Sequence, residues 1–312
     1  MPPLPPPVQG GGAPPVPTAL VALSPANARD AAAGATLEGL GASSLSALVD
    51  GASALSMSAS APALPRTHVL ARFIKQRIDQ LIGRQAPPGA RIAAAVAPPA
   101  CASGSATVTD NGPGSVIETF SACSPEADLS LSGTITISDM IVDPGVSFSA
   151  SITIDLLLKQ TRFPDMTFTA SNVAVVETIN VDVGTFTLSG KTQSGQDIFI
   201  TTGTATERLS NFTLMATFNG ATETDDVTFN YASTRIGGSV NVSTVTPCVT
   251  DATGNFPNTG VLSFAGAGGS RIQVTINGDE TLATPQLKIE LDADGDGAFE
   301  TSLDRNWADL LV

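Results

Sequence analysis

Aromatic side chains and histidine are scarce in this sequence. Its 312 residues include one Trp, one Tyr, 13 Phe and one His. A core must therefore be built mainly from Val, Ile, Leu and Phe, and few rings remain for a sugar-binding platform. The histidine, His68, lies in the first third of the chain. The remaining two thirds have no imidazole for a Ser-His-Asp site, a Cys-His site or a histidine-bound metal, so we expect that the protein is not an enzyme.

Nucleotide-binding and hydrolase motifs are missing or incomplete. No G-x-S-x-G elbow occurs in the sequence. Residues 189–192 read SGKT, but Gly184 and Gly190 have five residues between them. A phosphate-binding loop needs four. We therefore interpret this segment as a turn with an exposed lysine.

Long apolar runs are also absent, which excludes a membrane-spanning helix of about 18 apolar residues. The chain opens with MPPLPPPVQGGGAPPVP, which lacks the basic start of a signal peptide. The Pro/Gly-rich composition of residues 1–27 predicts an extended tether. Such a stretch is typical of the stalk that follows a lipid-anchored cysteine, and we hypothesise a misplaced start codon.

Acidic residues outnumber basic ones, and they are unevenly placed. The first 100 residues hold seven basic and four acidic side chains, whereas the remainder holds eight basic and 25 acidic ones. An acidic region of this size repels phosphate backbones, which argues against nucleic acid as a partner. Cations such as calcium suit it better.

Residues 28–100 are Ala-rich and predict a helical extension. Its clearest helix covers residues 66–83, where apolar side chains recur at 3.6-residue spacing between a capping Thr67 and Gly83. The opposite face is basic. This helix could lie on an anionic membrane surface, dock into a partner's groove, or cover the apolar face of its own sheet.

Residues 101–312 alternate apolar side chains with Ser and Thr, which predicts an antiparallel β domain. Asn219-Gly220 and Asn277-Gly278 indicate type I′ hairpin turns, and Gly133 indicates a bulge or a bend. The predicted fold class is mainly β, with large antiparallel sheets arranged as a sandwich or as a curved, barrel-like sheet. The predicted strands are 116–120, 129–138, 147–157, 167–175, 181–188, 197–202, 212–218, 227–231, 239–245, 261–264, 271–276, 287–291 and a last one running from 299 toward 307. Trp307 is expected to close the core.

Three cysteines suit an exported protein with one disulfide. Cys101 and Cys123 bracket a short hairpin-like stretch that could bring them together. Cys248 follows a proline in a predicted loop and would then stay free or pair between chains. The two other pairings remain open from the residues alone.

The sharpest motif is DADGDG at residues 292–297. Carboxylates at its first, third and fifth positions, before a turn-forming glycine, are spaced to converge on one calcium ion. A full EF-hand loop has Glu at position 12, where this chain has Leu303, so another acid must substitute. The candidate metal ligands are Asp292, Asp294, Asp296, Glu300 and Asp304.

Six stretches of the sequence are similar to segments found in a known group of proteins. They are GVLSFAGAGGSR at 260–271, LKIELDADGDGAFE at 287–300, NWADL at 306–310, CASGSATVT at 101–109, TFSAC at 119–123 and LSGTIT at 131–136. Together they resemble a broad group of proteobacterial envelope proteins, many of them predicted lipoproteins. The resemblance implies export and a disulfide between Cys101 and Cys123, and it implies no activity. This chain lacks the group's lipobox cysteine near its start.

These observations favour an exported, secreted or lipoprotein-like, non-catalytic protein. We expect a structural or binding role in the envelope or extracellular matrix, in the periplasm or at the outer-membrane surface. Its partners would be further copies, forming a multimer or filament, or other envelope proteins. The alternative is a carrier that holds an apolar ligand in a curved sheet. A carboxylate-based hydrolase is least favoured, with Asp225 and Asp226 or Glu177 and Asp182 as its candidate pairs.

Overall fold

The computed structural model describes residues 15–43 and 101–310, except 113, 125–128, 144–146, 161–165, 181–184, 193–196, 203–204, 219–221, 252–255 and 279–284. The described part is mainly β and antiparallel, which confirms the predicted fold class. The helix predicted at 66–83 and His68 lie outside the described residues. Among the helices within them, none has the length and apolar character needed to cross a bilayer.

The described residues form the helix α1 and then a succession of strands. The elements are α1 (Ala28–Ser43), β1 (Ser103–Asp110), β2 (Val116–Ser124), β3 (Leu129–Asp143), β4 (Ser147–Gln160), β5 (Met166–Asn180), β6 (Thr185–Thr192), β7 (Ile198–Thr202), β8 (Ala205–Phe218), β9 (Thr222–Ser233), β10 (Gly238–Asp251), β11 (Thr259–Ala265), the 3-10 turn η2 (Ala267–Gly269), β12 (Arg271–Ile276), β13 (Leu287–Asp292), β14 (Thr301–Arg305) and the short helix α3 (Trp307–Leu310).

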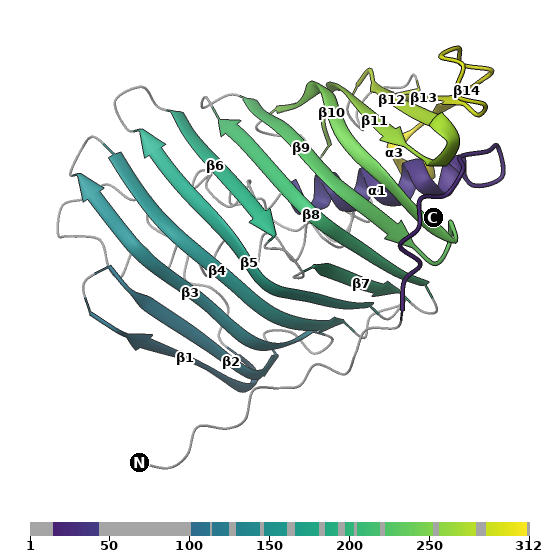
Figure 1. Ribbon diagram of the computed structural model, residues 1–312. Helices are drawn as coiled ribbons and strands as arrows, with labels where there is room; N and C mark the ends of the chain where they lie inside the picture. The colour runs from purple at the N-terminus through teal and green to yellow at the C-terminus, as the bar shows by residue number, and fades with distance from the viewer. Residues whose placement is uncertain are drawn as a thin grey trace.

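The strands pair in chain order as one continuous antiparallel ladder from β1 to β14. β6 and β7 together fill one row, because both pair with β5 on one side and with β8 on the other. The ladder is strongly twisted (Figure 1). A sheet of this many strands relieves its twist by curving instead of staying flat.

Alternating side chains place the core on one face of the ladder. In β12, Ile272, Val274 and Ile276 are buried, while the residues between them are only half-buried. The β12–β13 register sets Val274 opposite Ile289, which is buried as well. Gly133 has φ of 122° in β3 and lies opposite Phe120, beside a register shift between β2 and β3. The extra residue of that shift lies in β2, between Phe120 and Cys123, so the bulge predicted at Gly133 belongs to the neighbouring strand.

Some strand predictions need correction. β1 was missed because its Ser, Gly, Ala and Thr residues carry little apolar signal. Residues 189–192 lie at the end of β6 and not in a turn. Cys248 lies inside β10 and not in a loop, because register shifts in β10 accommodate the preceding Pro247.

The two predicted Asn-Gly turns have different outcomes. The turn between β8 and β9 lies outside the described residues, although the two strands pair as a hairpin up to Phe218 and Glu223. The connection from β12 to β13 spans residues 277–286, so the predicted two-residue turn there is wrong. The backbone of this connection also binds Trp307, whose indole N–H donates to the Gly278 carbonyl at 3.0 Å.

Residues before α1 are bonded to the β domain. The Val21 amide donates to the Ser239 carbonyl at 3.0 Å, and the Ser239 amide donates to the Ala19 carbonyl at 2.9 Å. The Val21 carbonyl accepts from the Ala267 amide at 2.8 Å, and Leu23 is buried. The described end of the predicted tether thus forms part of the folded unit.

α1 lies on the apolar face of the sheet, behind β8 to β10 in Figure 1. Ala28, Ala31, Ala32 and Ala35 are buried and lie on one side of the helix, since their spacing follows the helical repeat. Their small side chains let the helix approach closely. α1 contacts β8, β9, β12 and β13, so this end of the sheet curves around it.

Trp307 closes the core beside the last strand, as predicted. Its side chain is buried and stacks on Phe256, with ring centroids 4.7 Å apart. Its backbone amide donates to Oε1 of Gln286 at 3.0 Å.

Candidate metal site

The acidic motif forms the loop between β13 and β14. Asp292 is the last residue of β13, and β14 begins at Thr301. Gly295 and Gly297 have φ of 77° and 95°. These left-handed conformations suit glycine and turn the chain tightly enough to bring the acidic side chains together.

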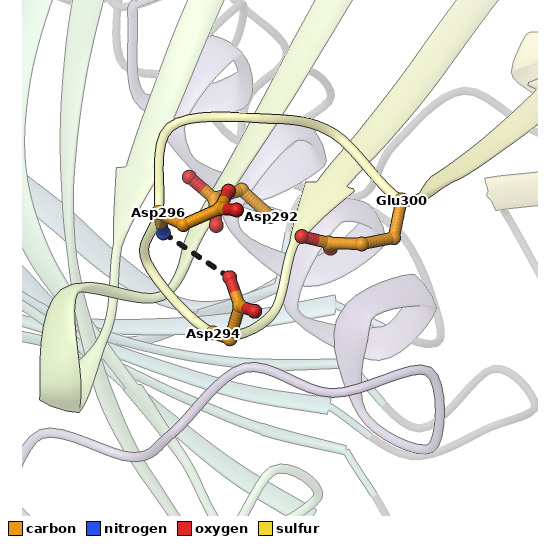
Figure 2. A group of neighbouring side chains, drawn as sticks. All are labelled: Asp292, Asp294, Asp296 and Glu300. Atoms are coloured by element: carbon orange, nitrogen blue, oxygen red, sulfur yellow. Dashed lines mark hydrogen bonds between the residues drawn. The ribbon is translucent and has the colours of Figure 1, made fainter.

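Four carboxylates converge inside this loop (Figure 2). They belong to Asp292, Asp294, Asp296 and Glu300, and each offers a ligand oxygen that lies within 4.8 Å of the other three. Asp292 is 2% exposed, whereas the other three are exposed to solvent. Oxygen ligands in this number and spacing can hold a metal ion.

Backbone amides hold the carboxylates in place. Asp292 accepts from the Gly295 amide at 2.7 Å and, through its other oxygen, from the Gly297 amide at 3.0 Å. Asp294 accepts from the Asp296 amide at 3.1 Å (Figure 2). Since the loop's own N–H groups fix these acids, the cluster is preorganised by the fold.

Glu300 closes the loop from its far end. Its Oε2 accepts from the Ala293 amide at 2.9 Å, and its own amide donates to the Leu291 carbonyl at 3.0 Å. Glu300 is the ninth residue counted from Asp292. It therefore supplies the fourth acid three positions earlier than the Glu of an EF-hand loop.

Asp304 does not belong to the cluster. It is exposed on β14 and lies opposite Lys288 in the β13–β14 register. Leu303 is half-buried opposite Ile289. Of the two acids expected to replace the missing Glu at position 12, only Glu300 is brought to the site.

Arg271 is a residue of this site that the sequence pattern did not reveal. It lies opposite Asp292 in the β12–β13 register, and its Nη2 is 3.5 Å from Asp292 Oδ2. The guanidinium also donates to the Gly297 carbonyl at 3.4 Å and lies 4.8 Å from the ring centre of Phe299. No local pattern links the two residues, because strand pairing alone brings them together.

Two of the cysteines form a disulfide, and the third is a free thiol. Cys101 and Cys123 form a disulfide with an S–S distance of 2.05 Å, which joins the residues before β1 to β2. Cys248 is free and buried. Burial, reinforced by the charges of Asp225 and Asp226, raises the pKa of its thiol to about 12.

The first candidate hydrolase pair, Asp225 and Asp226, does not have the geometry of a catalytic dyad. Asp225 is buried and Asp226 is exposed, because consecutive residues of β9 point to opposite faces of the sheet. Asp182 lies outside the described residues. Glu177 lies in β5, opposite Ala150 and Leu188.

No protein-family model matches the chain, and neither the curated proteins nor the solved structures include one that is significantly similar to it.

Proposed function

We propose that this protein is an exported, non-catalytic β scaffold of the cell envelope or extracellular matrix that binds calcium in the loop at residues 292–300. The observation that carries the proposal is the convergence of four carboxylates within 4.8 Å. Calcium prefers six to eight oxygen ligands at about 2.3–2.6 Å and tolerates irregular geometry. A loop with several carboxylate and backbone oxygens meets that preference better than it meets the strict octahedral geometry that magnesium requires.

Charge also supports a cation. The four acids bring four negative charges into one loop. Arg271, 3.5 Å from Asp292, neutralises only part of this charge. Like charges this close repel one another strongly where one of them, Asp292, is removed from water. A divalent cation would relieve that repulsion and tie β13 to β14.

The disulfide supports export. Disulfides persist in oxidising compartments and are rare where thiol reductants are abundant. The disulfide Cys101–Cys123 links the chain just before β1 to β2, and a calcium ion would link β13 to β14. A scaffold secured at both ends of the ladder suits a protein that works outside the cell.

Calorimetric titration with calcium, together with melting in calcium and in chelator, tests the proposal. We expect one site per chain, with weaker binding of magnesium. At calcium a hundredfold above its dissociation constant, binding adds about 2.7 kcal/mol to the free energy of unfolding. That corresponds to a rise in Tm of roughly 5–10 °C for a domain of this size.

A matched pair of variants makes the test specific. Asp294→Ala removes a ligand oxygen from the loop and should abolish the calcium effect. Asp304→Ala removes an exposed acid of the same hairpin that lies outside the cluster, and it should leave the effect unchanged. A wild-type protein with the same Tm in calcium and in chelator would overturn the proposal.

A further inference from the structure

The two ends of the ladder differ in how they could meet another strand. Within the described part of the chain, β1 pairs only with β2, and β14 pairs only with β13 (Figure 1). Every second residue of an edge strand points its N–H and C=O away from the sheet. Such an edge can accept another strand unless charge, proline or distortion protects it.

β14 has that protection. It has five residues, of which Asp304 and Arg305 are charged, and α3 begins two residues after its end. The acidic loop at residues 292–300 precedes it. A strand approaching this edge would meet charges and a helix.

β1 lacks the same protection. It contains no proline and no lysine, and its one charged residue is Asp110 at its end. An irregularity at Gly104 leaves a regular stretch, Ser105–Asp110, paired with β2 without a break. The disulfide Cys101–Cys123 anchors the chain just before this strand, so the edge is held in place.

The core is also incompletely covered at β1. Ala106 and Val108 face the core side of the sheet, where they pack against its buried residues but are themselves only half-buried. In the β1–β2 register they lie opposite Phe120 and Glu118, which are buried. A further strand beyond β1 would extend this face and cover both side chains.

We propose that β1 pairs with β1 of a second copy of the chain, antiparallel and about a two-fold axis at Thr107. Antiparallel partners that lie opposite each other point to the same face. A centre at Thr107 sets Ala106 against Val108 of the second copy, and Ser105 against Thr109. Asp110 then lies opposite Gly104, so no two carboxylates meet. A centre at Val108 would instead set Asp110 against Ala106.

This dimer requires no metal ion, because β1 and the acidic loop lie at opposite ends of the ladder (Figure 1). It goes beyond the calcium-binding scaffold and can fail while calcium binding stands, or stand while calcium binding fails. A two-fold interface uses the same surface on both copies and closes on itself. We therefore expect a dimer and not an open polymer through this edge.

Cysteine cross-linking of the whole chain tests the register. In the Thr107→Cys variant, the two new thiols face each other across the axis with Cβ atoms about 5 Å apart, close enough for a disulfide after a small shift. In the matched Thr109→Cys variant they lie about 13 Å apart. Both positions are exposed. The native cysteines interfere little, because two are already bonded and Cys248 is buried.

We expect a covalent dimer of Thr107→Cys on a non-reducing gel, at least tenfold more abundant than that of Thr109→Cys. Equal cross-linking of the two variants would overturn the register and the proposal with it. Sedimentation of the wild-type protein, from micromolar to submillimolar concentration, should show the mass rising to twice that of the monomer. A monomer throughout that range would also overturn the proposal.

A second pair of variants separates the two edges. Thr107→Lys sets two lysines opposite each other at the axis and should leave the protein monomeric, with the Tm that the wild-type protein has at concentrations where it is also monomeric. Ser302→Lys places the same exposed charge on β14 and should leave the dimer intact. Loss of the dimer in Ser302→Lys, or its persistence in Thr107→Lys, would contradict pairing through β1.

Discussion

Gly34 of α1 lies directly over the phenol of Tyr231 in β9. A Cβ atom on Gly34 would lie 1.9 Å from the Tyr231 hydroxyl oxygen. Tyr231 is itself buried and donates to Oε1 of Glu207 at 2.9 Å. The helix therefore approaches the sheet more closely here than any side chain on Gly34 would allow.

The first prediction concerns this contact. Alanine normally favours a helix over glycine by up to about 1 kcal/mol, but Gly34→Ala must push α1 away from Tyr231. We expect the free energy of unfolding to fall by about 1–3 kcal/mol, as in other overpacked cores. Urea denaturation measures the change.

A second variant identifies the cause. Adding Tyr231→Phe to Gly34→Ala removes the closest atom of the clash, so the double variant should recover part of the stability lost by the single one. Strictly additive losses would show that the hydroxyl is not responsible.

The second prediction concerns pH. Burial raises the pKa of Glu207 above 4.5, although the hydrogen bond from Tyr231 and the charge of Arg235 oppose the shift. Folding thus favours the protonated acid, and this contribution to stability is lost as pH rises through the folded pKa. Stability from this group therefore falls from about pH 4.5 upward.

Glu207→Gln should abolish that pH dependence. The amide oxygen can still accept from Tyr231, but the side chain no longer ionises. We expect the urea midpoint of the variant to rise relative to wild type as the pH is raised from 4 toward neutrality. Midpoints that stay parallel across this range would show that Glu207 does not titrate in the folded protein as proposed.

The third prediction concerns thiol reactivity. Cys248 is buried, its pKa is raised to about 12, and a Cβ on neighbouring Gly260 would lie 2.8 Å from its sulfur. Because the thiolate is the reactive form, Cys248 should not react with a thiol reagent at pH 8 in the native protein. Rapid reaction of the folded chain would contradict this arrangement.

Unfolding makes the same measurement a test of the disulfide. The unfolded chain should show one reactive thiol without reductant and three with it, because Cys101 and Cys123 are bonded to each other. Protein isolated from its native source gives the strongest form of the test. Three thiols before reduction would argue against an oxidising location.

The fourth prediction concerns Arg271, the basic residue beside Asp292. Without its guanidinium the four acids lose a counter-charge, so Arg271→Gln should lower the Tm more in chelator than in calcium. Lys288→Gln is a matched control, because Lys288 pairs with Glu290, which lies outside the acidic cluster. If Arg271→Gln lowered the Tm equally in chelator and in calcium, Arg271 would have a purely structural role.

The sequence by itself determined the features that depend on neighbouring residues. Alternation of apolar and hydroxylated side chains predicted most strands, since a pleated strand repeats every two residues. Three carboxylates of the candidate site lie within one hexapeptide, residues 292–297, and Glu300 follows closely, so local spacing was enough to find them.

Only the tertiary structure decided the features that join distant segments. Strand pairing brings Arg271 to Asp292, and a register between strands cannot be read from either strand alone. The seating of Gly34 on Tyr231, 197 positions away in the chain, depends on the close approach of helix and sheet. The sequence of β1 has too few apolar residues to predict a strand. It forms one because β2 supplies its hydrogen-bond partners. Local pattern sets which face of an element is apolar, whereas packing decides which faces meet.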